Sequence, residues 1–136
     1  MGWKFYDLDR IAQKLVIKAK DRDGLVAKNK KSLPQAHKMR MAVAYGLERF
    51  WGEHLRLQDK ESNKSQFWEE TWTEFVGIMK TTGVEIPDDT QANMPEKLWA
   101  LDLDTQRVAL AVLTQLCDAI IWWTQRYKTG DSNDDD

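Results

Sequence analysis

The sequence predicts an all-α protein, a single compact helical bundle of about four to five helices. Helix breakers are scarce, with 7 Gly and 3 Pro among 136 residues, and apolar residues recur at spacings of three and four rather than two. A chain of this length forms one ordinary domain, which buries about two-thirds of the surface that its unfolded form exposes. We therefore expect one bundle domain over residues 1–130, followed by an acidic, disordered tail at 131–136.

The first helix is expected over about Asp7–Lys20, because its apolar residues share one face and aspartates lie at its positive N-terminal end. A loop should follow over Asp21–Lys31, with Gly24 as the breaker. The apolar face of this helix consists of Leu8, Ile11, Ala12, Leu15 and Ala19.

One long second helix is expected from about Ser32 to Leu57. It opens with Ser32-Leu33-Pro34-Gln35, in which a hydroxyl residue precedes Gln by three positions, as in a capping box, and Pro stands in the first turn. The polar stretch 58–65 should end this helix. At about 100° per residue, its inward face comprises Met39, Val43, Gly46, Leu47, Phe50, His54 and Leu57.

A third helix is expected over about Gln66–Thr81, followed by a loop. A second capping box, Asn93-Met94-Pro95-Glu96, should open a short helix through Leu101. The tryptophans of the third helix fall at helical spacing among apolar residues, which favours core packing over an exposed stacking platform. Its predicted inward residues are Phe67 or Trp68, Thr71 or Trp72, Phe75 and Met79.

The last helix should run from Asp104 or Thr105 to about Lys128 and is apolar almost all round. Such a helix is normally central in a bundle, or it packs against another subunit. Of the neighbours Trp122 and Trp123, one must point away from the face that the other buries, because they lie about 100° apart. That residue is a candidate subunit contact.

Charge is divided between the two halves of the chain. Met1–Lys64 contains 15 Lys and Arg against 8 Asp and Glu, whereas Ser65–Asp136 contains 5 against 14. This division suggests a polyanion as partner of the basic half, and a neighbouring copy of the chain as a partner of the acidic half.

The basic residues also follow a geometric pattern. On one continuous second helix, Lys38, Arg49 and Arg56 would fall within about 20° of one line, with Tyr45 between them. Separated cations with an interposed aromatic suit a surface that tracks a nucleic-acid backbone. The alternative is an ordinary solvated helix surface. The candidate nucleic-acid-binding residues are Lys14, Lys18, Lys28, Lys30, Lys31, Lys38, Arg40, Arg49 and Arg56.

No catalytic or metal site is expected. Glu70 and Glu74 are four apart, not three as in the metal-binding helices of nucleotide pyrophosphohydrolases, and His37 and His54 have no Glu three positions before them, as di-metal bundles require. Cys117 lies in an apolar run, which is typical of an inert buried thiol. The protein is therefore predicted not to be an enzyme and to need no cofactor.

The N-terminal segment Met1–Phe5 has no apolar signal region, and no stretch is expected to reach the ~20 apolar residues of a membrane span. We expect a cytoplasmic protein with no membrane partner.

The C-terminal run from Asp104 to Tyr127, with Arg107 near its start and Trp122-Trp123 close to its end, resembles the final helix of type III CRISPR–Cas small subunits. Over about Asp7–Lys128, the pattern of a small helical protein with a basic face and no active site resembles the small subunit of multi-subunit (type I/III) CRISPR–Cas effector complexes.

This resemblance implies a non-enzymatic subunit of a ribonucleoprotein complex involved in antiviral defence. It would contact guide RNA and the target or displaced strand through the backbone, while base pairing with the guide reads sequence. Its other partners would be further subunits and copies of itself, stacked head to tail. The alternative is a helical protein-interaction module or phage-encoded inhibitor that uses an acidic face and Trp anchors.

Overall fold

The computed structural model describes residues 5–87 and 93–130, so the predicted tail at 131–136 lies outside the described residues. Within those two ranges the chain is all-helical and has no strand, as predicted. These described residues form six α-helices and two short 3-10 helices, more than the four to five helices expected. The elements are α1 (Phe5–Asp23), η1 (Lys28–Lys30), α2 (Gln35–Ala42), η2 (Val43–Tyr45), α3 (Leu47–Leu57), α4 (Ser62–Thr81), α5 (Met94–Trp99) and α6 (Leu103–Gly130).

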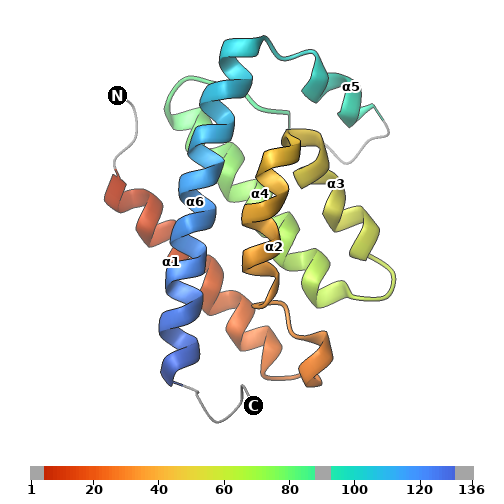
Figure 1. Ribbon diagram of the computed structural model, residues 1–136, viewed down its shortest axis with the longest axis vertical. Coiled ribbons are helices and arrows are strands. Elements are labelled where there is room, and N and C mark those ends of the chain that lie inside the picture. The colour runs from red at the N-terminus through yellow and green to blue at the C-terminus, as the bar shows by residue number, and fades with distance from the viewer. Residues whose placement is uncertain (1–4, 88–92, 131–136) are drawn as a thin grey trace.

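Helix α6 runs the length of the molecule, and α1, α2 and α4 pack against it (Figure 1). Helix α3 packs against α4, and α5 lies against α3. One apolar core connects all six helices because each presents its apolar stripe inward. Its fully buried side chains include Leu15, Met39, Phe50, Phe67, Trp68, Phe75, Leu98, Leu113 and Leu116.

The predicted long second helix is wrong: the structure divides it into α2, η2 and α3. The break lies at Gly46, whose φ of 100° and ψ of 171° are accessible to glycine but not to other residues without strain. The residues predicted to face inward on both sides of the break, such as Met39 and Phe50, are nevertheless buried. Apolar periodicity therefore located the buried residues but not the turn between the helices.

The predicted capping box at Ser32 and Gln35 is also wrong, because both side chains bond to distant residues. Ser32 donates its backbone N–H and its Oγ hydroxyl to Oδ1 of Asp23, at 2.7 and 2.8 Å. Gln35 Oε1 accepts a hydrogen bond from Trp68 Nε1 at 3.0 Å. At the second predicted box, Asn93 precedes α5 but makes no side-chain capping bond.

The other helices are confirmed with shifted ends. Helix α1 continues three residues beyond Lys20, and α4 begins at Ser62, four residues before the expected start. On α4, Trp68 and Trp72 are both buried, which agrees with core packing. Of the adjacent pair on α6, Trp122 is the residue that points to solvent.

The expectation that no stretch suits a membrane span is wrong for one helix. By length and composition, Leu103–Tyr127 of α6 is long and apolar enough to cross a bilayer, with a mean hydropathy of 1.3. In the structure its buried residues, including Ala109, Leu113 and Ile120, form the core with α1, α2 and α4. The place of α6 in the bundle thus explains part of its apolar character, since 39% of this apolar window is buried.

Two glycine substitutions test the position of the break. Gly46→Ala should destabilise the protein by about 1 to 3 kcal/mol, because alanine is strained at positive φ. Gly77→Ala, at an exposed helical position with no atom within 4 Å of an added Cβ, should stabilise it by about 0.5 to 1 kcal/mol. Urea unfolding of both variants checks the signs; a stabilising Gly46→Ala would argue for an uninterrupted helix.

Candidate nucleic-acid interface

The crossing of α1 and α4 brings basic and acidic residues of the two chain halves together. Lys14 Nζ lies 2.9 Å from Glu74 Oε2, and Lys18 Nζ lies 3.9 Å from Glu70 Oε2. Arg22 Nη1 donates to both carboxylate oxygens of Glu70 at 3.0 Å. Two candidate nucleic-acid-binding residues, Lys14 and Lys18, are thus committed to ion pairs within the protein.

Two further candidates are also paired. Arg40 Nε donates to Asp118 Oδ1 at 2.9 Å and ties α2 to α6. Arg56 makes two hydrogen bonds of 2.8 Å to the carboxylate of Glu53 within α3. The hydrogen bond and the negative charge of Glu53 raise the pKa of Arg56.

These contacts change the meaning of the charge division seen in the sequence. Lys14, Lys18 and Arg40 come from the basic half, and their partners come from the acidic half. Folding therefore pairs some basic residues of the first half with acidic residues of the second half, so the two kinds of charge are not separated into two regions of the molecule. Partly exposed pairs of this kind each stabilise a fold by at most about 1 kcal/mol, but they lower the positive potential around α1.

The predicted line of Lys38, Arg49 and Arg56 requires one straight helix and is wrong, because Gly46 separates α2 from α3. Locally, Arg49 lies over the ring of Tyr45, with its guanidinium carbon 5.2 Å from the ring centroid. This cation–π contact presents an exposed aromatic together with a cation.

The remaining candidates lie in or next to one acid-free stretch. Between Gly24 and Leu47 the chain has five Lys and Arg and no Asp or Glu. It forms the connection after α1, then α2 and η2, which follow one another along one side of the molecule (Figure 1). Lys30 donates to the backbone carbonyl of Lys60 at 3.1 Å, which fixes the connection against the α3–α4 turn. The candidates here are Lys28, Lys30, Lys31 and Lys38, with Arg49 following directly in α3.

The structure adds an aromatic and basic cluster that the sequence prediction missed. The guanidinium carbon of Arg126 lies 5.5 Å from the ring centroids of both Trp122 and Trp123. Trp123 stacks on Tyr127, whose ring is 5.6 Å from Lys20 Nζ. The spacing of four between Trp122 and Arg126 was the available signal, since such residues meet on a helix.

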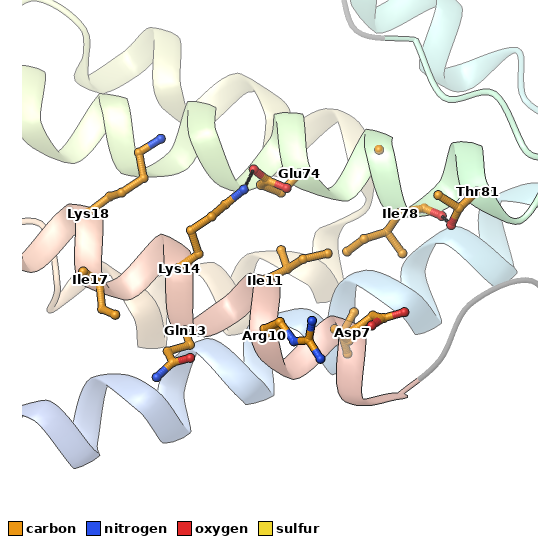
Figure 2. A pocket seen from close by; sticks show the side chains of 12 residues that line it. Asp7, Arg10, Ile11, Gln13, Lys14, Ile17, Lys18, Glu74, Ile78 and Thr81 are labelled. Atoms are coloured by element: carbon orange, nitrogen blue, oxygen red, sulfur yellow. Dashed lines mark hydrogen bonds and ion pairs between the residues drawn. The ribbon is translucent and has the colours of Figure 1, made fainter.

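A hollow of about 750 Å³ lies between α1 and α4 (Figure 2). Figure 2 shows Ile11 and Ile78 facing each other along it, with Lys14 joined to Glu74 across one side. Lys14 and Glu74 at this rim pair with each other, and Lys18 pairs with Glu70 of α4, so we read the hollow as part of the α1–α4 crossing and assign it no ligand.

The structure also places the residues weighed as possible metal ligands or nucleophiles in the part of the chain that it describes. No group of three or more His, Cys, Asp or Glu residues is placed to hold a metal ion there. Cys117 is buried, and burial raises the pKa of its thiol to about 12, so it stays protonated and unreactive at neutral pH. His54 is buried with Nδ1 against the carbonyl of Trp51.

Comparison of the chain with protein-family models, with curated proteins and with solved structures finds no match. Function therefore has to be argued from the surface described above.

Proposed function

We propose that the protein is a non-enzymatic, nucleic-acid-contacting subunit of a ribonucleoprotein complex, the small subunit of a CRISPR–Cas effector being the class it resembles. The acid-free stretch from Gly24 to Leu47 carries this proposal. A solvated surface of average composition would mix both charges, whereas this stretch contains five cations with no internal carboxylate, of which Arg40 is paired with Asp118 of α6. It is also the part of the basic half that lies away from the α1–α4 ion pairs.

In this proposal, lysines of the connection and of α2 contact successive phosphates, and the Tyr45–Arg49 pair contacts a base or sugar. Exposed Lys30 and Lys38 are separated along the surface, as phosphates are along a strand. An aromatic ring stacks on any base, so such contacts hold a strand without reading its sequence. Sequence would be read by base pairing between the guide RNA and the target.

The partners follow from the same proposal: guide RNA, the target or displaced strand, other effector subunits and copies of the chain, in the cytoplasm. Head-to-tail stacking remains a prediction. Fewer carboxylates are available to contact a neighbouring copy, because Glu70, Glu74 and Asp118 already pair within the protein.

The proposal predicts weak binding to single-stranded RNA or DNA that is insensitive to base sequence and sensitive to salt. With three to five phosphate contacts, log K should fall with log salt concentration at a slope of about −2 to −3.5. Fluorescence anisotropy with two oligonucleotides of unrelated sequence, titrated at several salt concentrations, measures both properties. Absence of binding at low salt, or strong preference for one sequence, would refute the proposal.

The second candidate is a protein-interaction module, which the exposed apolar residues favour. Leu25, at the tip of the connection after α1, is 88% exposed, and Trp122 is 53% exposed. The use of an acidic face as a nucleic-acid mimic is less favoured, since two carboxylates of α4, Glu70 and Glu74, already pair with basic residues of α1. Purification without nuclease, followed by measurement of the 260/280 nm absorbance ratio, separates the two candidates: a bound RNA supports the first.

A further inference from the structure

The outward face of α6 carries large apolar side chains that the bundle leaves uncovered. Trp122 is 53% exposed and Val108 is 51% exposed. They lie 14 residues apart, which is two heptads, and therefore share one face of the helix. Exposed tryptophan is uncommon on free surfaces and enriched where two proteins meet.

Contacts behind Trp122 hold its side chain in place. The ring of Trp123 meets it edge-on with centroids 4.9 Å apart, and Arg126 lies 5.5 Å from its ring. Trp123 is itself fixed to α1, because its Nε1 donates to Asp9 Oδ1 at 2.9 Å. A side chain already held in one position loses little entropy on binding, so Trp122 is suited to anchor a contact.

On this face, residues at equal distances before and after Gln115 can pair with one another in two copies of the helix. Trp122 and Val108 both lie seven residues from Gln115. In an antiparallel pair of α6 helices with a two-fold axis at Gln115, each Trp122 therefore meets Val108 of the second copy. Both apolar residues become covered in a single contact.

The same two-fold axis also brings residues of opposite charge together. Arg126 and Asp104 both lie eleven residues from Gln115, and both are exposed. Each Arg126 therefore meets Asp104 of the second copy, twice in the dimer. Nearer the axis, Ala111 and Ala119 lie four residues from Gln115 and are small enough to let the helices approach. Antiparallel helices also place opposite ends of their dipoles together.

We infer that the outward face of α6 binds a second copy of this chain, as an antiparallel pair of α6 helices about a two-fold axis at Gln115. This inference goes beyond the proposed function, because the contact needs no nucleic acid and contains none of the candidate nucleic-acid-binding residues. A two-fold contact is closed and yields a dimer, whereas head-to-tail stacking is open and yields a filament.

Sedimentation equilibrium of the full chain without nucleic acid tests the dimer. Trp122→Ala should raise the dimer dissociation constant by about tenfold or more, while Trp99→Ala should leave it unchanged. Trp99 is a matched control, since it is 66% exposed but belongs to α5. A monomeric wild-type protein, or equal effects of the two variants, would overturn the inference.

Charge reversal tests the pairing. Asp104→Arg and Arg126→Asp should each weaken the dimer by bringing like charges together. The double variant should recover part of the lost affinity, because opposite charges meet again while the Arg126 contact to Trp122 is removed. Both residues are exposed, so the fold tolerates these changes. A double variant as weak as the single ones would contradict the two-fold pairing.

A cross-link tests the position of the axis. Gln115→Cys places two thiols at the axis, and copper phenanthroline, as the oxidant, should remove two electrons and two protons to join them in a disulfide. The native Cys117 should not form a cross-link, because it is buried. Leu25→Cys, more exposed and far from α6 in sequence, is the control and should cross-link slowly. Equal cross-linking rates for the two variants would rule out the proposed axis.

Discussion

Asp23→Ala is expected to lower the free energy of unfolding by about 3 to 5 kcal/mol, the largest loss for any single charged residue in the described parts of the chain. The Asp23 side chain ends α1 and is only 3% exposed. Its carboxylate accepts the backbone N–H and hydroxyl of Ser32, the N–H of Leu33 at 2.9 Å and Nδ2 of Asn63 at 3.3 Å. Alanine would leave these donors without an acceptor, two of them on a fully buried serine.

Asp21→Ala is the matched control, because Asp21 is an exposed carboxylate in the same last turn of α1. It should change the free energy of unfolding by no more than about 0.5 kcal/mol. Asp23→Asn keeps the shape and one acceptor oxygen, so its loss should fall between the two. Urea unfolding followed by circular dichroism measures all three; similar losses for Asp21→Ala and Asp23→Ala would show that the hydrogen-bonded carboxylate does not join α1 to α2 and α4.

Trp68→Ala should cost about 3 to 5 kcal/mol, because it empties the largest fully buried side-chain site in the core. The indole packs on Phe50, with centroids 4.9 Å apart, and its N–H is the partner of the buried Gln35 amide. Trp68→Phe retains much of the packing but leaves the amide oxygen unpaired, so its smaller loss separates the two contributions.

Trp99→Ala is the control for this series, since Trp99 is mostly exposed on α5. Its loss should stay within about 0.5 kcal/mol. If Trp68→Ala were no more harmful than Trp99→Ala in urea unfolding, the packing of α3 on α4 around Trp68 would have to be revised.

The helices and their buried faces could be predicted because periodicity is a local property of the sequence. The same periodicity explains the main error. Apolar residues continue in phase from Val43 to Leu47 and Phe50, so the pattern does not register the turn at Gly46. The glycine itself is a local signal of the turn, but the periodicity places Gly46 on the inward face of a continuous helix.

Capping and charge pairing could not be predicted because both depend on partners distant in sequence. The spacing of Ser32 and Gln35 suits a local cap, but Asp23 and Trp68 bind their side chains instead. A count of charges in each half of the chain likewise cannot show that α1 crosses α4. This crossing pairs Lys14 with the carboxylate of Glu74, 60 positions later. The sequence indicates the candidate cations, and the structure separates those that form ion pairs from the others in or next to the acid-free stretch. The ion-paired candidates are Lys14, Lys18, Arg40 and Arg56.

The most direct test of this division compares two triple variants that remove equal charge. Lys30, Lys31 and Lys38 replaced by Ala alter the acid-free stretch, whereas Lys14, Lys18 and Arg56 replaced by Ala alter residues already ion-paired. Affinity for a single-stranded oligonucleotide is measured by fluorescence anisotropy over a range of salt concentrations. The first variant should lose at least about tenfold in affinity, and its salt slope should be shallower by about 2, while the second should change little. Equal losses, or a larger loss in the second variant, would contradict the assignment of nucleic-acid binding to the acid-free stretch.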